Sequence, residues 1–228
     1  MYIGDSTYIL VIIGMLLVMW AQSRVTRTFD KFNEVPTTHR IRGREAAQAI
    51  LDAKGLTDVA IEPVSGNLTD HYDPVKKVLR LSEATYDSTS IAAVAVAAHE
   101  CGHAVQDGEN YQPLRFRSAL VPLTNIGSTI SIPLILMGIL LGMAKLTLVG
   151  IVAFSLVLIF QLVTLPVEFD ASRRAMTILE SHGLLASQEI GPARSVLNAA
   201  AWTYVMSAFS TALQLLRFII LMGRQRND

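Results

Sequence analysis

Residues 92–108 read AAVAVAAHECGHAVQDG and place two histidines and a glutamate among small apolar residues. On a helix, residues four positions apart share a face, so His99 and His103 can direct ring nitrogens at one point. Zinc accepts neutral imidazole, and two such ligands leave room for a third protein ligand and a water molecule. Zinc lowers the pKa of that water and polarises a carbonyl, while Glu100, next to the first histidine, can take the proton. The spacing therefore predicts zinc-assisted hydrolysis.

The helix that carries this motif is predicted to begin at Ile91, after a capping serine that is either Ser88 or Ser90. Its apolar run ahead of His99 is too short to cross a bilayer, so we expect the helix to be buried in protein. Cys101, the single cysteine of the chain, points elsewhere on the helix. We interpret it as a small buried thiol rather than as a ligand.

The composition is typical of a membrane protein. Hydrophobic residues make up 51% of the 228 residues and charged residues 17%, against about 25% charged residues in typical soluble domains. The mean hydropathy is +0.41. The net charge is zero, which gives no electrostatic signature of a nucleic-acid-binding protein. We therefore expect a lipid bilayer, and no nucleic acid, among the partners.

Four segments approach the roughly twenty apolar residues that a membrane-spanning helix needs. They are residues 7–21, 120–144, 146–165 and 199–223. The first has an acidic head without a basic residue, the reverse of a secretory signal, so we interpret it as a retained anchor. A polar stripe on the fourth either hydrogen-bonds to other helices or lines a substrate path. The stripe consists of Thr203, Ser207, Ser210, Thr211, Gln214 and Arg217.

The polar segment after the first span is predicted to form a small α+β portion. A helix is expected over residues 44–53, stopped by Gly55. The runs at residues 59–64 and 78–82 predict strands, and residues 68–72 are a candidate third strand. The fold class is therefore mainly α, with multi-pass membrane helices and a small α+β, zincin-like portion.

This organisation predicts five consecutive parts of the chain. They are an N-terminal transmembrane anchor (1–22), a zincin-like segment with the H-E-x-x-H helix (23–118), two transmembrane helices (119–166), a helical segment with the third zinc ligand (167–198), and a fourth membrane segment with the C-terminus (199–228).

Basic residues predict the orientation in the cell membrane. Arg24, Arg27 and Lys31 after the first span outweigh its uncharged-to-acidic head, so the N-terminus is expected outside and the catalytic segment in the cytoplasm. Four alternating crossings place the motif and the end of the third span on one side. The same crossings leave Arg224 and Arg226 outside, against the charge rule, unless the fourth segment does not cross completely.

A third metal ligand must come from elsewhere in the chain. After the third span the sequence reads TLPVEFDASRRA, in which Pro166 is expected to kink or restart the helix as it leaves the membrane. Glu168 and Asp170 follow at once. From the residues alone, these carboxylates are either part of the metal site or part of a charged collar at the membrane interface.

The sequences AAHECGHA and EFDASRRA, separated by two spans, resemble the YugP-type membrane zinc metallopeptidases of bacteria and archaea. GNLTDHYDP…LRLSEATY extends the resemblance, which covers about residues 40–210. The pattern is similar to that of the gluzincins, including the membrane proteases of the HtpX and CAAX-prenyl-protease kind, in which a glutamate on a later helix completes the zinc site. The resemblance implies zinc held by His99, His103 and Glu168, with Glu100 as the general base.

One position departs from the HtpX-like pattern. That pattern has an aspartate four residues after the glutamate, where this chain has Ser172, and Asp170 lies only two residues after Glu168. Asp170 should point about 200° around the helix from Glu168, so both carboxylates cannot face one metal ion. Asp170 is therefore expected to orient a histidine or to pair with Arg173 or Arg174.

Three further residues are weaker candidates. His71 either stabilises a turn or lies on a strand that a peptide substrate joins by backbone pairing. His182 and Tyr204 are alternative donors to the oxyanion of a tetrahedral intermediate, and the sequence does not choose between them.

Together these features predict a membrane-embedded zinc endopeptidase that hydrolyses a peptide or membrane-protein substrate. The alternative is a non-proteolytic zinc-binding membrane scaffold or chaperone-like protein. Glu100 favours the enzyme, because a structural zinc site closes its fourth position and needs no carboxylate beside an open one. An intramembrane protease of the site-two type would carry H-E-x-x-H within a full span and an aspartate ligand in another, and neither is visible.

Overall fold

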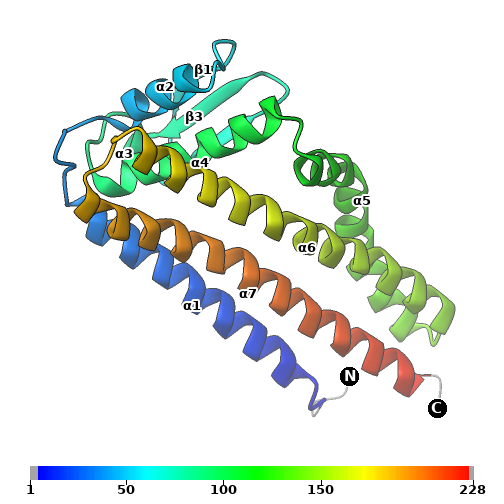
Figure 1. The fold of residues 1–228 in the computed structure, drawn as a ribbon. Helices are drawn as coiled ribbons and strands as arrows, with labels where there is room; N and C mark the ends of the chain where they lie inside the picture. The colour runs from blue at the N-terminus through cyan, green and yellow to red at the C-terminus, as the bar shows by residue number, and fades with distance from the viewer. Residues whose placement is uncertain (1–4, 226–228) are drawn as a thin grey trace. The chain divides into compact units, whose positions relative to one another are not determined.

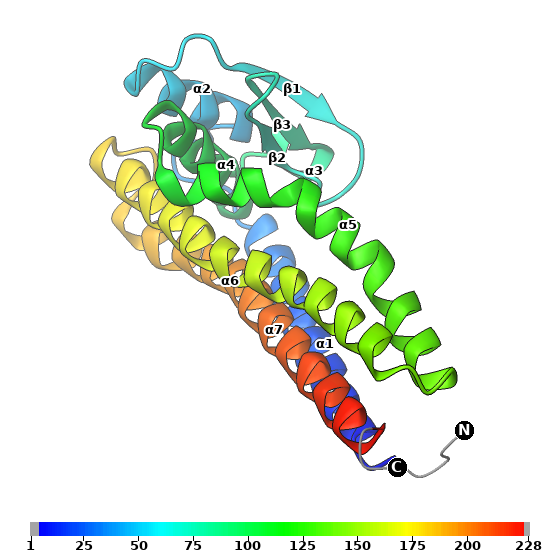
Figure 2. The same cartoon turned by 90° about the vertical axis from the view of Figure 1, so that its right-hand side faces the viewer.

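The computed structural model describes residues 5–225, which form seven helices and three strands (Figures 1 and 2). These residues divide into two compact units. We call the first the sheet unit; it comprises residues 22–115 and 166–202. The second, the helical unit, comprises the described residues up to Ala21, Phe116–Leu165, and those from Thr203 onward.

The sheet unit contains a three-stranded sheet and several short helices. In chain order they are α2 (Gly43–Ala53), β1 (Ala60–Val64), β2 (His71–Asp73), β3 (Val78–Ser82), α3 (Glu83–Tyr86) and α4 (Ile91–Gly108). The strand order is β1-β3-β2, with β1 parallel and β2 antiparallel to the central β3. The mainly α fold with a small α+β portion is thus confirmed.

The strand expected over residues 68–72 begins later in the structure than the sequence predicts. Residues 68–72 are the expected strand, whereas β2 begins at His71. The reason is the turn that precedes it: Leu68 has a positive φ of 55°, and the Asp70 carboxylate accepts hydrogen bonds from the backbone N–H and the hydroxyl of Ser82. Extended pairing can start only after this anchored turn.

Helix α4 lies in the core of the sheet unit, as its small residues predict. The Ser90 hydroxyl accepts a hydrogen bond from the backbone N–H of Ala93 and caps the helix, so Ser90 rather than Ser88 has this role. Val94 and Ala98 are fully buried. α4 packs against α2 and contacts β2 and β3 (Figure 2). The helix is therefore held on several sides, which fixes the direction of the polar side chains that it carries.

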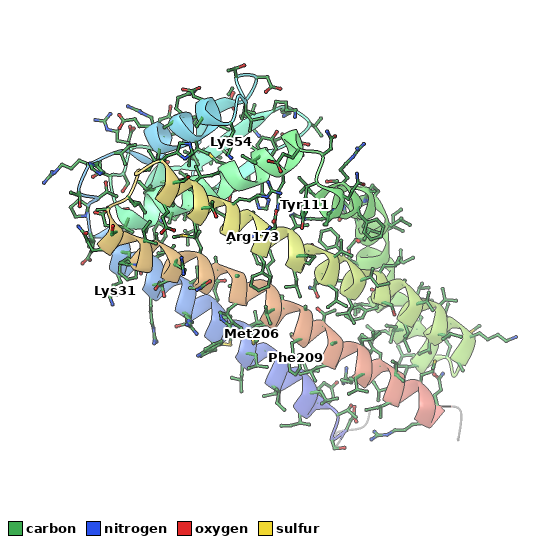
Figure 3. The ribbon with its side chains drawn as sticks, in the orientation of Figure 1. Lys31, Lys54, Tyr111, Arg173, Met206 and Phe209 are labelled. Carbon is green, nitrogen blue, oxygen red and sulfur yellow. The ribbon has the colours of Figure 1, made fainter. Side chains whose placement is uncertain are left out.

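Four long helices supply the helical unit and extend into the sheet unit. They are α1 (Tyr8–Asn33), α5 (Gln112–Leu140), α6 (Ala144–Ser181) and α7 (Ser187–Gln225). Each is long and apolar enough to cross a membrane, with windows of mean hydropathy between 1.7 and 2.6. Large apolar side chains along these helices are exposed, among them Phe209 of α7 (Figure 3). The chain is a membrane protein.

One expected boundary of these helices is wrong, and one of the two alternatives for Pro166 is excluded. The second membrane segment does not continue to residue 144: α5 ends at Leu140, and Gly142, with φ of +68°, reverses the chain before α6 begins. The helix also does not restart at Pro166, because α6 continues through it to Ser181. A proline removes one backbone hydrogen bond, which the turns on either side tolerate in a long helix. Glu168 therefore lies on the same helix as the third span.

Small and charged residues join α1 to α7, which lie side by side in Figures 1 and 2. A Cβ atom at Gly14 would lie 2.5 Å from the Ser210 hydroxyl oxygen and 3.2 Å from the Ser210 Cα atom, so the glycine favours a close approach of the two helices. Arg217 lies 3.6 Å from the Asp5 carboxylate and over the Tyr8 ring, 4.1 Å from its centroid. Two members of the polar stripe, Ser210 and Arg217, thus make contacts with the first helix.

Candidate metal centre

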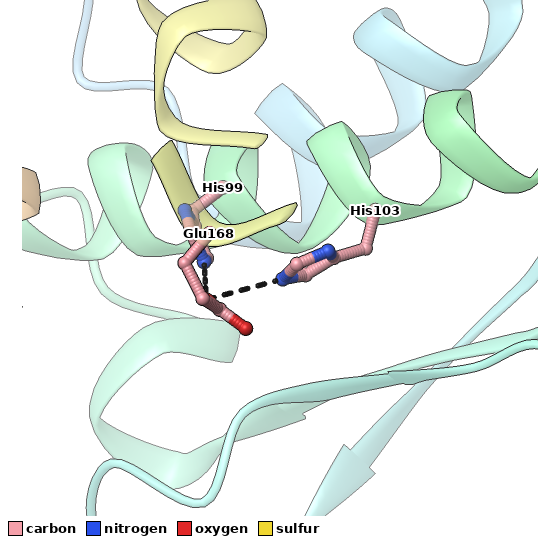
Figure 4. Close-up of side chains that lie close together, drawn as sticks. All are labelled: His99, His103 and Glu168. Carbon is pink, nitrogen blue, oxygen red and sulfur yellow. Dashed lines mark ion pairs between the residues drawn. The ribbon is translucent and has the colours of Figure 1, made fainter. Parts of the chain in front are cut away.

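The structure brings together the three residues for which the sequence predicts metal ligation (Figure 4). His99 and His103 lie one turn apart on α4, with their rings edge to face and the ring centroids 4.9 Å apart. Glu168 projects from α6, and its side chain is buried. Its Oε2 lies 3.3 Å from His99 Nε2 and 3.6 Å from His103 Nε2. One donor atom from each residue lies within 4.8 Å of the others.

Helix α6 reaches α4 because residue 102 has no side chain. A Cβ atom at Gly102 would lie 2.5 Å from the carbonyl oxygen of Ala171, well inside van der Waals contact. Ala171 follows Glu168 by three residues on α6, so this contact sets how deeply the Glu168 carboxylate reaches between the histidines. The glycine inside H-E-x-x-H is therefore part of how the site is assembled.

The donor set fits a zinc ion. In a tetrahedral site with ligand distances of about 2.0–2.2 Å, neighbouring ligand atoms lie roughly 3.3–3.6 Å apart. The two Nε2–Oε2 separations are 3.3 and 3.6 Å. Two imidazoles and one carboxylate are a common catalytic zinc set, and such a set leaves a fourth position open.

The second ring nitrogen of each histidine, Nδ1, contacts a polar side chain. His99 Nδ1 lies 3.0 Å from the Ser172 hydroxyl, and His103 Nδ1 lies 3.0 Å from Oε1 of Gln106. Both rings therefore turn Nε2 towards Glu168. Neither contact is predicted from the sequence, although the spacing of Gln106, three residues after His103 on one helix, could have indicated the second.

Asp170 lies next to the site without joining the donor group. Its carboxylate pairs with Arg173 and Arg174 and accepts a hydrogen bond of 2.9 Å from Nε2 of Gln106. Arg174 in turn pairs with Glu109 at 2.5 Å. The arginine pairing expected for Asp170 is present, and its link to a histidine passes through Gln106.

Glu100 and Cys101 occupy different environments on α4. The Glu100 side chain is half-buried, and within residues 5–225 no hydrogen bond or ion pair holds its carboxylate. Cys101 is fully buried, its Sγ lies 3.7 Å from the carbonyl oxygen of Ala47 on α2, and burial raises the pKa of its thiol. The interpretation of Cys101 as a buried thiol is therefore confirmed.

The protonation of His103 reflects its carboxylate neighbours. Burial lowers the pKa of His103. The hydrogen bond to Glu168 and the negative charges of Glu100 and Glu168 raise it by more, so the pKa of His103 lies above its ordinary value. The buried surroundings of His103 thus favour a positive charge near the two carboxylates, the electrostatic preference that a bound cation satisfies.

The remaining candidate residues lie elsewhere. His71 is exposed on β2, and its Nδ1 lies 2.8 Å from the carbonyl oxygen of Thr69, as in a stabilised turn. His182 follows the end of α6, about 20 Å along the helix from Glu168 at a rise of roughly 1.5 Å per residue. It therefore lies away from the donor group. Tyr204 belongs to the helical unit, and its role stays a prediction.

Comparison with known proteins places the chain in a family. Residues 7–223 match a family described as "Putative neutral zinc metallopeptidase". A protein of Bacillus subtilis (strain 168) named "Putative membrane protease YugP" is 45% identical over 220 residues, which cover 96% of this chain and 98% of the relative. No solved structure matches the chain. The chain therefore belongs to this zinc metallopeptidase family, as the resemblance in its sequence implies.

Proposed function

We propose that the chain is a membrane-embedded zinc endopeptidase in which His99, His103 and Glu168 hold the metal. The observation that carries this proposal is the convergence of these three donors from α4 and α6 within 4.8 Å. The description of the family and the name of the relative support a peptidase. The unpaired carboxylate of Glu100, adjacent to His99, favours an enzyme over a zinc-binding scaffold.

The residues of the chain have separate tasks in this proposal. Zinc, when bound, lowers the pKa of a water molecule and polarises a carbonyl group. Glu100 takes the proton of the attacking water and delivers it to the amine of the leaving peptide. Because no hydrogen bond or ion pair among the described residues holds Glu100, its carboxylate is free to turn between these two positions.

The sheet offers a place for an extended substrate. β2 is an edge strand, since the strand order is β1-β3-β2, and α4 contacts it. An unpaired strand edge can bind an extended peptide through backbone hydrogen bonds. Figure 4 draws strands of the sheet below the three donor side chains, and α4, which carries the two histidines, contacts β2 and β3. This arrangement supports a peptide, or an unfolded stretch of a membrane protein, as the substrate.

The sheet unit is proposed to lie in the cytoplasm. The chain enters or leaves this unit after Ala21, before Phe116, after Leu165 and before Thr203, once for each long helix. Four alternating crossings place all four junctions on one side of the membrane. Arg24, Arg27 and Lys31 lie just past the first junction, and basic residues favour the cytoplasmic side.

Zinc content and peptide cleavage of the purified, full-length protein test the proposed function. We expect about one zinc ion per chain and cleavage of a peptide library at internal bonds. A chelator should abolish the cleavage, and added zinc should restore it. Tightly bound zinc without cleavage of any peptide would instead support the scaffold, whereas protein that binds no zinc would contradict both functions.

A further inference from the structure

Gln106 is a buried amide whose every polar group has a partner. Its side chain is completely inaccessible to solvent. Its Nε2 donates hydrogen bonds of 2.9 Å to the carbonyl oxygen of Val167 and of 2.9 Å to Oδ2 of Asp170, both on α6. Its Oε1 lies 3.0 Å from Nδ1 of His103. The amide therefore links the second histidine of the motif to two positions that flank Glu168.

These partners determine which way the amide faces. A backbone carbonyl and an ionised carboxylate can only accept hydrogen bonds, so the NH2 group of Gln106 must face Val167 and Asp170. Oε1 then faces His103, and because this oxygen only accepts, His103 Nδ1 must carry the hydrogen. In the neutral ring the lone pair is left on Nε2, the nitrogen that lies 3.6 Å from Glu168 Oε2.

His99 has no such constraint from its partner. Its Nδ1 lies 3.0 Å from the hydroxyl of Ser172. A serine hydroxyl can donate or accept, so this contact is compatible with either position of the ring hydrogen. The two histidines of the motif are therefore supported differently.

We propose that Gln106 is a positioning residue that fixes the tautomer of His103, so that Nε2 is presented to the metal, and that it links this ligand to Asp170. This inference rests on the proposed metal site. Asp170 is itself paired with Arg173 and Arg174, so the amide donates its hydrogen bond to a carboxylate that two ion pairs hold in place. Substitution of a group that orients a ligating histidine through its second nitrogen commonly lowers metal affinity about 10- to 100-fold.

The surroundings of Gln106 require an amide rather than a carboxylate. A carboxylate of the same size would place negative oxygens against the Val167 carbonyl and Asp170, where both neighbours accept hydrogen bonds. Gln106→Glu should therefore weaken zinc binding, although it keeps an acceptor for His103. Asp170→Asn in the same chain supplies an NH2 group in place of the opposing carboxylate, and the double variant should bind zinc more tightly than Gln106→Glu alone.

Nitrogen-15 NMR of the histidine rings in the full-length, zinc-loaded wild-type protein tests the tautomer directly. Signals are assigned with single His→Gln variants. We expect a hydrogen on Nδ1 of His103 that exchanges slowly with water, because it lies in a buried hydrogen bond. A His103 ring without a hydrogen on Nδ1 would overturn the inference. This measurement needs no Gln106 variant to fold.

Zinc competition with a chelator tests the link to the metal. Gln106→Met keeps the length of the side chain and removes its hydrogen bonds, and we expect a loss of zinc affinity of about 10- to 100-fold. Gln48→Met, at an exposed glutamine of α2, is the matched control and should bind zinc as the wild type does. Equal affinities of Gln106→Met and the wild type would overturn the inference, as would a double variant no better than Gln106→Glu.

The same titration separates this inference from the proposed function. A wild-type protein that binds no zinc would contradict the metal site itself. A wild-type protein that binds zinc, together with a Gln106→Met variant that binds it equally well, would contradict only the role of Gln106.

Discussion

Glu168 and Asp170 are two carboxylates, two residues apart on α6, that perform different tasks. Positions two residues apart on a helix differ by about 200° around its axis, so the two side chains leave the helix in nearly opposite directions. Glu168 lies between the two histidines, whereas Asp170 pairs with Arg173 and Arg174. Position around one helix, and not residue type, therefore separates the proposed metal ligand from a group that supports the proposed ligands.

Glu168→Gln should weaken zinc binding more than Asp170→Asn. The first substitution replaces a negative ligand by a neutral amide, while the second removes charge from a group that acts on His103 only through Gln106. Zinc affinities of both variants, measured by chelator competition, check this order, and Asp170→Asn should keep part of the wild-type activity. The reverse order of affinities would make Asp170 the ligand.

At the scale of the elements, the site depends on how closely α4 and α6 approach. The histidines belong to one helix and the glutamate to the other, so the distance between the helices decides whether the three donors meet. Gly102 permits contact with the backbone of Ala171. The site is thus a property of a helix pair, and residues that never touch the metal can change it.

Gly102→Ala should lower both stability and zinc affinity. Its Cβ atom would lie 2.5 Å from the Ala171 carbonyl oxygen, so the helices must separate, at a cost of about 1–3 kcal/mol for overpacking. Gly191→Ala is the matched control, because a Cβ atom at this glycine of α7 meets nothing within 4 Å. Thermal unfolding and zinc titration compare the two variants. A Gly102→Ala protein with wild-type zinc affinity would contradict the role given to this helix contact.

The elements were more predictable from the sequence than the contacts between them. Ser90, the small residues of α4 and the apolar residues of β3 act locally, so these elements follow from nearby residues. Gln106 and Ser172 gain their roles only when α4 and α6 meet, across separations of more than sixty residues. The H-E-x-x-H spacing indicated two ligands by helix geometry, whereas Glu168 required a resemblance to known proteins, because no local pattern joins it to His99.

At the scale of the whole molecule, ion pairs join the start of the first long helix to the end of the last one. The Asp5 carboxylate lies 2.9 Å from the guanidinium of Arg224 and 3.6 Å from that of Arg217. The fourth membrane segment therefore reaches the level at which the first begins. In the proposed orientation Arg224 lies outside the cell, where the charge rule disfavours a basic residue. Asp5 partly offsets its positive charge. Arg226, the other residue in that expectation, lies outside the described residues.

Labelling of single cysteines in a Cys101→Ala background tests this topology. Ala60→Cys lies on β1 of the sheet unit, and Met143→Cys lies between α5 and α6, where Met143 is exposed. In intact cells, an impermeant thiol reagent should label Met143→Cys, and it should label Ala60→Cys only after permeabilisation. The opposite pattern would contradict the cytoplasmic assignment. Equal labelling of both positions would contradict an arrangement in which the membrane separates them.

Glu100→Gln tests most directly the claim that the chain is a zinc peptidase. Glutamine cannot accept a proton from water, so cleavage of peptides should fall by about 100- to 10,000-fold, the usual contribution of a general base. Bound zinc should stay close to the wild-type amount, because Glu100 is not one of the three donors. Glu34→Gln, at an exposed glutamate, is the control and should keep both zinc and activity. Cleavage at the wild-type rate by zinc-loaded Glu100→Gln protein would contradict the mechanism.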